Sequence, residues 1–215
     1  GLLTANPQIG EDVHRVFLQL TSLGKVSALS HLLESPFTLH PGMIDKIARE
    51  QAHAEAGRSA RIIIKVNSLV EPRIIRALYA ASQAGVPIDL IVRGMCCLRP
   101  GVEGVSDNIR VRSIIGRFLE HTRVFYFANN ATPEVFCSSA DWMERNFFRR
   151  VETAFPLLDA DLRERVIDDL QTYLDDNTQA WVLDCEGEYH RLEPATADTA
   201  ANAQTALLQR YGESG

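Results

Sequence analysis

The sequence predicts an α/β protein whose sheet is at least partly parallel, and three observations support this prediction. A β-branched run at 61–66 (RIIIKV) is typical of a strand that is buried on both faces. A helical pattern follows it, and a second apolar run at 88–92 (IDLIV) completes a strand–helix–strand unit. Such a crossover joins parallel strands, so at least two neighbouring strands run in the same direction.

The chain before this unit is expected to form two helices and a short strand. Asn6 offers a capping side chain, Pro7 suits the first helical position, and apolar residues then recur at helical spacing to about Leu23. Residues 28–34 are predicted to form a short strand. A second helix is expected from 41 to 57, where glycine ends it.

A ligand site is expected beyond the strand at 88–92. The crossover helix opens at Glu71-Pro72 and ends at Gly85, and a Gly/Pro loop at 94–107 follows the second strand. Ligands of open α/β sheets gather outside the carboxyl ends of the strands, which is where Arg93 is expected.

The second half of the chain is expected to extend the sheet. Apolar segments predict strands at 124–127, 135–137 and 151–155. A charged helix is expected at 159–174, and an edge strand at 181–184.

Composition excludes several classes of protein. The 215 residues carry a net charge of -6, which argues against general nucleic-acid binding. No apolar run approaches the roughly 20 residues that a bilayer span needs. The four cysteines include an adjacent pair and lack C-x-x-C spacing, which favours a reducing, cytosolic compartment and argues against zinc.

One basic stretch stands out within this acidic chain. Six arginines fall within 31 positions, at 93, 99, 110, 112, 117 and 123. Only three acidic residues lie among them. The planar fork of arginine suits phosphate oxygens, so the stretch predicts a polyanionic ligand. His121 precedes a predicted strand, so it is expected on the same face as Arg123 and can carry a proton near neutral pH. The alternative is an ordinary surface histidine at a strand edge.

Other polar residues carry weaker signals. Ser138 and Ser139 follow a short strand, where they could hold an anion. The alternative is that Ser139 or Asp141 caps a turn or short helix. Lys65 and Asn67 share one face of the buried strand, although Lys65 is also suited to extend its head to solvent.

Long motifs in this chain resemble the C-terminal part of bacterial polyphosphate kinases of the long-chain, histidine-autophosphorylating type. The motifs are KVNSLVEPRIIRALYAASQAGVPIDLIVRGMCCLRPGVEGVSDNIRVRSIIGRFLEH and SSADWMERN, and the opening GLLTANPQIGEDVHRVF and SPFTLH are similar too. The resemblance spans residues 1 to about 190. It implies a phospholipase D-like mixed sheet flanked by helices. It divides the chain into the trailing part of a preceding domain (1–25), a C-terminal domain (26–194) and a tail that is a frayed helix or disordered (195–215).

The resemblance also implies an activity and a site. The family reversibly transfers the terminal phosphoryl group of ATP to inorganic polyphosphate with Mg²⁺, whose ligands are expected outside this chain. Arg93 and His121 match ATP-contacting positions, and His121-x-Arg123 matches the His-x-Lys signature of the phospholipase D fold with arginine in place of lysine. His121 is expected to be catalytic, and further phosphate contacts are expected from Lys65, Asn67, Arg123, Ser138, Ser139 and Arg150.

Partners follow from the same resemblance. The family's phosphorylated histidine lies upstream of the segment that begins here, so His121 is expected to contact phosphate rather than to accept it covalently. The expected partners are ATP or ADP, polyphosphate, the N-terminal domains of the same polypeptide and further copies in a homo-oligomer, with no nucleic acid. The expected location is cytoplasmic, with peripheral contact to the inner membrane, and the chain alone is expected to be inactive. Two alternatives stay open: a phospholipase D-type phosphodiesterase half-site, and a non-catalytic polyanion-binding module.

Overall fold

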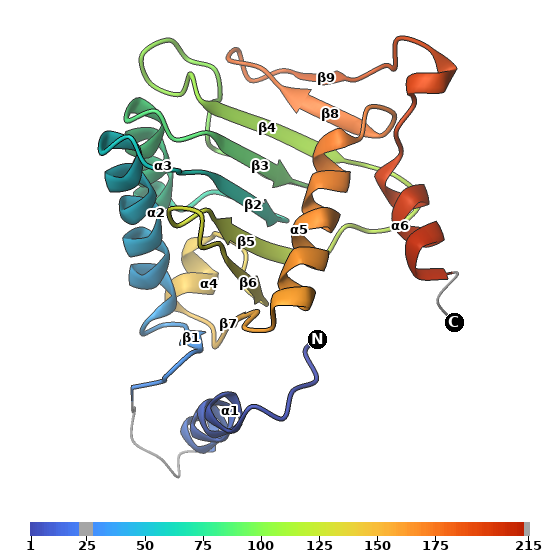
Figure 1. The fold of residues 1–215 in the computed structure, drawn as a ribbon. Coiled ribbons are helices and arrows are strands. Elements are labelled where there is room, and N and C mark those ends of the chain that lie inside the picture. Colours follow the sequence, from blue (N-terminus) through green and yellow to red (C-terminus); the bar gives the residue numbers. More distant parts are fainter. Residues whose placement is uncertain (22–27, 213–215) are drawn as a thin grey trace.

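The computed structural model describes residues 1–21 and 28–212, and these build a nine-stranded sheet in the order β1-β7-β6-β5-β2-β3-β4-β8-β9 (Figure 1). The strands β2, β3 and β4 run parallel to one another, and the other neighbouring pairs are antiparallel. The prediction of an α/β fold with a partly parallel sheet is confirmed. The strands are β1 (Leu33–Glu34), β2 (Ile62–Val66), β3 (Ile88–Val92), β4 (Ile109–Ile114), β5 (Arg123–Phe127), β6 (Glu134–Ser138), β7 (Thr153–Pro156), β8 (Ala180–Leu183) and β9 (Tyr189–Arg191).

Helices cover both faces of the sheet, with α2 and α3 on one face and α5 on the other (Figure 1). The described helices are α1 (Pro7–Leu20), α2 (Leu39–Glu55), α3 (Pro72–Gln83), α4 (Glu144–Phe148), α5 (Ala160–Asp175) and α6 (Ala203–Gly212). None of these is both long enough and apolar enough to cross a membrane.

The central strand β2 explains why the sheet needs both helical layers. Ile62 and Ile64 belong to the apolar core that α2 and α3 cover, whereas Ile63 belongs to the core on the α5 face. Successive side chains of a strand point to opposite faces, so Lys65 shares the α5 face with Ile63. The uninterrupted apolar run therefore marks a strand buried on both sides.

Capping side chains fix the starts of three predicted helices. Asn6 accepts hydrogen bonds from the first turn of α1, Glu71 from the backbone N–H of Ile74 in α3 (2.7 Å), and Asp159 from that of Leu162 in α5. These helices confirm the predictions from the sequence. The helix α1 ends at Leu20, and the end expected near residue 23 lies outside the described residues.

The strand expected at 28–34 is wrong for most of its length, because only Leu33–Glu34 joins the sheet. The buried carboxylate of Asp12 accepts the backbone N–H groups of Ser30, His31 and Leu32 at 2.7 to 3.0 Å. Those amides therefore have a partner other than a neighbouring strand. The second helix begins at Leu39, two residues before the expected start.

The strand β4 was not predicted, and the outer part of the sheet differs from expectation. In β4 the apolar residues alternate with Arg110 and Arg112, which is the period of a half-buried strand. The strand β8 lies between β4 and β9, so β9 and not the predicted 181–184 segment forms the edge. The strand expected at 151–155 begins at Thr153.

The tail contains a docked helix. Of the two alternatives for residues 195–215, disorder is wrong for 203–212, which form α6, and this helix is packed on α5 instead of frayed. The carboxylate of Asp176 accepts the backbone N–H of Ala203 at 2.7 Å, and Gln204 is buried. The expected boundary near residue 25 lies outside the described residues, so the division into domains stays a prediction.

Candidate functional site

Residues from four strands meet where β2 and β3 end. The strand β5 is antiparallel to β2, so its first residue, Arg123, lies beside the carboxyl end of β2. Ser138, the last residue of β6, pairs with Arg123. Arg93 follows β3, which is parallel to β2. The sheet register therefore gathers residues that are far apart in the sequence.

Arg123 is held in place by a buried carboxylate. Its Nε and Nη2 donate to the two oxygens of Asp141 at 3.2 and 3.0 Å, and the two side chains are 13% and 10% exposed. Asp141 also accepts the backbone N–H of Asn67 at 2.8 Å, which ties the segment after β6 to the end of β2. Burial raises the pKa of Asp141, and its hydrogen bonds with Arg123 and Asn67 outweigh that effect, so its pKa lies below the usual carboxyl value.

This lowered pKa predicts a pH dependence of stability. A carboxylate with a depressed folded-state pKa stabilises the fold above its ordinary value of 3.8, and this contribution is lost as pH falls through the folded-state value. We expect the free energy of unfolding to decline below about pH 4, and Asp141→Asn to reduce the part of the decline that comes from this site. Urea unfolding of the unchanged chain and of Asp141→Asn from about pH 6 to pH 2 measures this difference in the decline. An unchanged pH profile in Asp141→Asn would contradict this assignment.

Lys65 is buried under the same edge. Its ammonium group lies 2.9 Å from a carboxylate oxygen of Glu120 and donates to the hydroxyl of Thr122 at 2.7 Å. Burial is the largest effect on its pKa and lowers it, and the nearby positive charges of Arg93 and Arg123 act in the same direction. At 2% exposure Lys65 does not extend to solvent, so that alternative is wrong.

Arg93 bonds the backbone of the residue that precedes His121, although Arg93 itself is not among the residues that line the cavity described below. The Nη1 of Arg93 donates to the carbonyl oxygen of Glu120 at 2.9 Å, and His121 is the next residue. With its amide oxygen turned toward Arg123, Asn67 accepts from that guanidinium at 2.6 and 3.0 Å and donates to the same Glu120 carbonyl at 2.8 Å. Arg93 and Asn67 therefore both bond the backbone carbonyl immediately before His121.

The imidazole itself is exposed and touches Arg123. The Nη1 of Arg123 lies 3.2 Å from Nδ1 of His121 and donates to the carbonyl of the same residue at 3.0 Å. The prediction that the two side chains share a face is confirmed. When Nδ1 accepts from the guanidinium, Nε2 carries the ring hydrogen and is the donor available to a phosphate oxygen.

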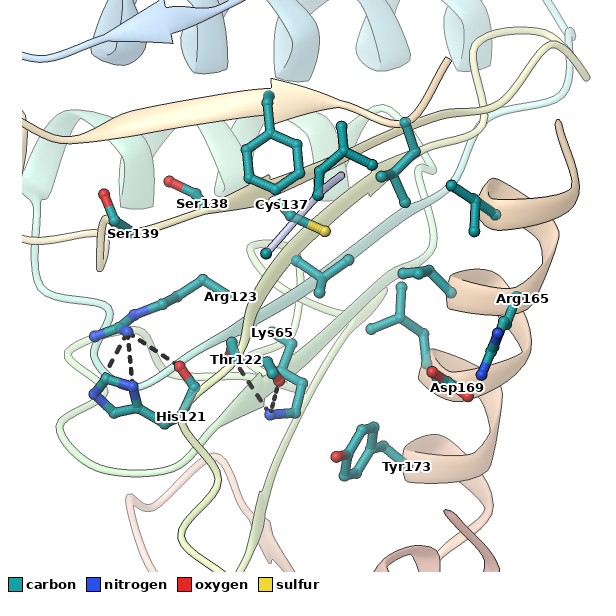
Figure 2. Close-up of a pocket in the computed structure, with 18 of the residues that line it drawn as sticks. Lys65, His121, Thr122, Arg123, Cys137, Ser138, Ser139, Arg165, Asp169 and Tyr173 are labelled. Carbon is teal, nitrogen blue, oxygen red and sulfur yellow. Dashed lines mark hydrogen bonds between the residues drawn. The ribbon is translucent and has the colours of Figure 1, made fainter. Parts of the chain in front are cut away.

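His121 and Arg123 line one end of a cavity of about 1000 Å³ on the α5 face of the sheet. Figure 2 shows Lys65, His121 and Arg123 on one side of this cavity and Arg165, Asp169 and Tyr173 of α5 on the other. Its middle is apolar and includes Val124, Phe155, Leu157, Val166 and Leu170. A ligand there would meet cations and an imidazole at one end and apolar side chains beyond them.

The two serines line the cavity but already have protein partners. The Ser138 hydroxyl donates to the carbonyl of Thr153 at 2.9 Å and accepts the backbone N–H of Ala140. The Ser139 hydroxyl donates to a carboxylate oxygen of Glu152 at 2.5 Å and accepts the backbone N–H of Thr153. These bonds tie the end of β6 to β7. A helix cap by Asp141 is not formed, since Met143 precedes α4.

Most of the arginine stretch does not face this cavity. Arg99 donates to the carbonyl of Glu186, and Arg110 pairs with Asp89 near the opposite end of β3. The interpretation of six arginines as one anion-binding surface is therefore wrong for these two.

Two further arginines also have other roles. Arg112 donates to carbonyls at the carboxyl end of α5, including that of Leu174, and so caps the helix. Arg117 lies over the ring of Phe118. Arg150 is exposed just after α4 and is not among the cavity residues, so its phosphate contact stays a prediction.

Sequence reasoning missed two residues that build the site, Glu120 and Gln204. Glu120 was counted only as an opposing charge, yet it binds Lys65 with its carboxylate and Arg93 with its carbonyl. Gln204 reaches Glu120 from the C-terminal helix at 2.8 Å. No local pattern marks these contacts, because the partners are separated by 84 residues in the case of Gln204.

A magnesium site does not fit the described residues. Within 1–21 and 28–212, no three His, Cys, Asp or Glu side chains come together in a way that could hold a metal ion. Asp169, which lines the cavity, binds Arg210 and Tyr211, and the carboxylates of Glu120 and Asp141 are paired with Lys65 and Arg123. No chemical step is therefore assigned to a metal on this chain.

Comparisons with solved structures identify the fold. A crystal structure of polyphosphate kinase from Porphyromonas gingivalis matches with a TM-score of 0.92 and 38% identity, over 98% of this chain and 32% of that one. Nuc from Salmonella typhimurium, a phospholipase D family member, matches with a TM-score of 0.50 and 18% identity, over 74% of this chain and 96% of Nuc. The mixed sheet flanked by helices is therefore phospholipase D-like, as predicted.

Sequence comparisons identify the family. Residues 32–204 match the family model described as polyphosphate kinase C-terminal domain 2. The polyphosphate kinases of Xylella fastidiosa (strain Temecula1) and Neisseria meningitidis serogroup B are 59% and 58% identical over 97% and 99% of this chain. The chain spans 30% and 31% of the length of these two relatives. It belongs to the polyphosphate kinase family and carries C-terminal domain 2 of that family.

Proposed function

We propose that this chain forms part of the phosphoryl-transfer site of a polyphosphate kinase, which moves the terminal phosphoryl group of ATP to inorganic polyphosphate and back. The observation that carries the proposal is that His121 and Arg123 line the polar end of one cavity, while Arg93 donates to the carbonyl of Glu120, the residue before His121. A loose phosphoryl-transfer transition state needs fixed positive charge and alignment, and these side chains are fixed by protein contacts.

The chemistry has two balanced steps. The bond between the β–γ bridging oxygen and the terminal phosphorus of ATP breaks as a histidine nitrogen of the preceding domain bonds that phosphorus, and ADP leaves. The phosphorus–nitrogen bond then breaks as a terminal oxygen of polyphosphate attacks. His121 donates a hydrogen bond to the transferring group from Nε2, or exchanges a proton with it, while Arg93 contacts the nucleotide phosphates.

The charges of the site would allow a bound polyphosphate chain to move through it. Lys65 and Arg123 are neutralised by Glu120 and Asp141, whereas the guanidinium of Arg93 donates to a backbone carbonyl and has no carboxylate partner among the described residues. Lys65 and Asn67 support the site, since their donors already have protein partners. A few weak contacts, including those of Ser138, Ser139 and Arg150, would let polyphosphate advance by one unit at a time, where many strong contacts would hold it.

The complete enzyme is proposed to need more than this chain. The phosphorylated histidine and the ligands of Mg²⁺ would come from preceding domains, and the enzyme would act as a homo-oligomer in the cytoplasm, with peripheral contact to the inner membrane. The chain alone would bind substrates without turning them over.

A titration tests the proposal. Isothermal calorimetry of this chain with inorganic polyphosphate is expected to show binding that weakens about tenfold between 50 and 200 mM salt for two to three phosphate contacts, by analogy with nucleic acids. Arg93→Ala should weaken it and Arg99→Ala, on the far loop, should not. Equal losses in both variants would favour a non-catalytic polyanion surface. Metal-independent hydrolysis of a phosphodiester by the chain would favour the phosphodiesterase half-site.

A further inference from the structure

The segment before His121 is held by the C-terminal helix. Gln204 of α6 accepts the backbone N–H of Phe118 at 2.9 Å and donates to the carbonyl of the same residue at 2.8 Å. Its amide nitrogen also lies 2.8 Å from a carboxylate oxygen of Glu120. One side chain thus bonds both backbone groups of Phe118, three positions before His121, and the side chain of Glu120, which immediately precedes His121.

This contact is buried and highly specific. Gln204 is 7% exposed and Glu120 is 8% exposed. Each lost hydrogen bond would therefore leave a buried polar group without a partner, because water does not reach it. The second oxygen of the Glu120 carboxylate binds Lys65 at 2.9 Å. The carboxylate therefore bonds both the sheet and the C-terminal helix, and loss of Gln204 removes one of these attachments.

The helix that carries Gln204 is itself anchored on α5. Its first residue, Ala203, donates to the carboxylate of Asp176, and the hydroxyl of Tyr211 donates to Asp169 at 2.6 Å. Asp176 directly follows α5, and Asp169 lies on the cavity side of α5. The helix α6 is thus a fixed support for the loop.

A glycine makes room for this arrangement. A Cβ added at Gly116 would lie 2.5 Å from the Gln204 side-chain oxygen, closer than real Cβ atoms come. The backbone of Gly116 is not in the left-handed region, and the three heavy atoms nearest to the added Cβ all belong to Gln204. Gly116→Ala therefore displaces the Gln204 amide without removing it.

We propose that Gln204 is a positioning residue of the phosphoryl-transfer site, which holds Glu120 and the 118–120 backbone so that the exposed His121 ring stays aligned. The inference rests on the proposed function, since it assigns Gln204 an effect only through His121. Among the described residues, the His121 ring makes its hydrogen bonds with Arg123, so its placement depends on the segment that leads to it. A shift of about 1 Å in an aligned group can lower a rate by up to a hundredfold.

A double-mutant cycle in the complete enzyme tests this inference. Gln204→Met keeps the side-chain length and removes the hydrogen bonds, and it is expected to lower kcat for polyphosphate synthesis about tenfold. In a His121→Ala background, Gln204→Met should lower the residual rate by less than about twofold, because the group that it aligns is gone. Gly116→Ala should follow the same pattern with a smaller loss, and it replaces Gln204→Met in the cycle if that variant does not fold. The matched control is Gln209→Met, an exposed glutamine on the same helix, which should leave kcat unchanged.

The outcomes separate the two proposals. Losses that multiply in the double variant mean that Gln204 acts on the fold in general, which overturns the inference. Unchanged kcat in both Gln204→Met and Gly116→Ala, with His121→Ala impaired, overturns it too and leaves the proposed function standing. Normal synthesis by His121→Ala overturns the proposed function itself.

Discussion

Replacing His121 by alanine in the complete enzyme is expected to lower polyphosphate synthesis by about 10²- to 10⁴-fold, the usual contribution of a positioned acid–base group. The ring lies at the polar end of the cavity, with one nitrogen beside the Arg123 guanidinium and the other available to a phosphate oxygen. Alanine removes that donor and leaves the backbone contacts of Arg93 and Arg123 in place. Initial rates of ATP consumption with polyphosphate as acceptor measure the loss.

His121→Gln separates the two roles of the ring. Glutamine can still donate a hydrogen bond but cannot exchange a proton near neutral pH. Recovery of most of the rate in His121→Gln would assign hydrogen bonding, and a loss equal to that of alanine would assign proton transfer. His190→Ala is the matched control, because His190 is an exposed histidine on the edge strand β9. Its activity should stay within about twofold, as exposed ion pairs contribute little. A His121→Ala enzyme as active as this control would exclude the proposed role.

The sequence predicted the elements whose signals are local. The run at 61–66, the capping Glu71 and the strand at 88–92 each carry their signal within a few residues, and together they require a parallel pair. The same logic placed Arg93 at the carboxyl end of a strand and His121 on the same face as Arg123. These residues were found because a strand's direction and its alternation are both readable from sequence.

The features that the sequence did not predict depend on long-range contacts or on patterns that fit more than one structure. The alternation of arginines with apolar residues at 109–114 fits a strand as well as a ligand surface, and the register of β4 with β3 decides for the strand. Asn67, whose backbone N–H binds Asp141, lies 74 residues from it, and Glu120 lies 84 residues from Gln204. Their own neighbours in the sequence carry no mark of those contacts, which exist only because the sheet and α6 bring the segments together.

The largest expected effect on stability is that of Arg123→Ala. It leaves the carboxylate of Asp141 buried without its cation, and breaking a buried ion pair in this way costs about 3–5 kcal/mol. The control is Arg149→Ala, which breaks an exposed pair with Glu144 and should cost under about 1 kcal/mol. Urea unfolding of this chain measures both. A loss for Arg123→Ala no larger than that of the control would mean that the pair adds nothing to the fold.

Two further substitutions show what the arginine provides beyond its charge. Arg123→Lys keeps the charge but loses the two-pronged bond to Asp141, so about 1.5–3 kcal/mol should be lost with the missing charged hydrogen bond. Replacing both partners, as in Arg123→Met with Asp141→Leu, should restore much of the stability, because no charge is then left buried. The double variant also removes the guanidinium beside the His121 ring and the acceptor of the Asn67 N–H. It should therefore be more stable than Arg123→Ala but less stable than the unchanged chain, because the Asn67 N–H is left without its acceptor. The complete enzyme should remain strongly impaired, which would separate the pair's effect on folding from its effect on the site.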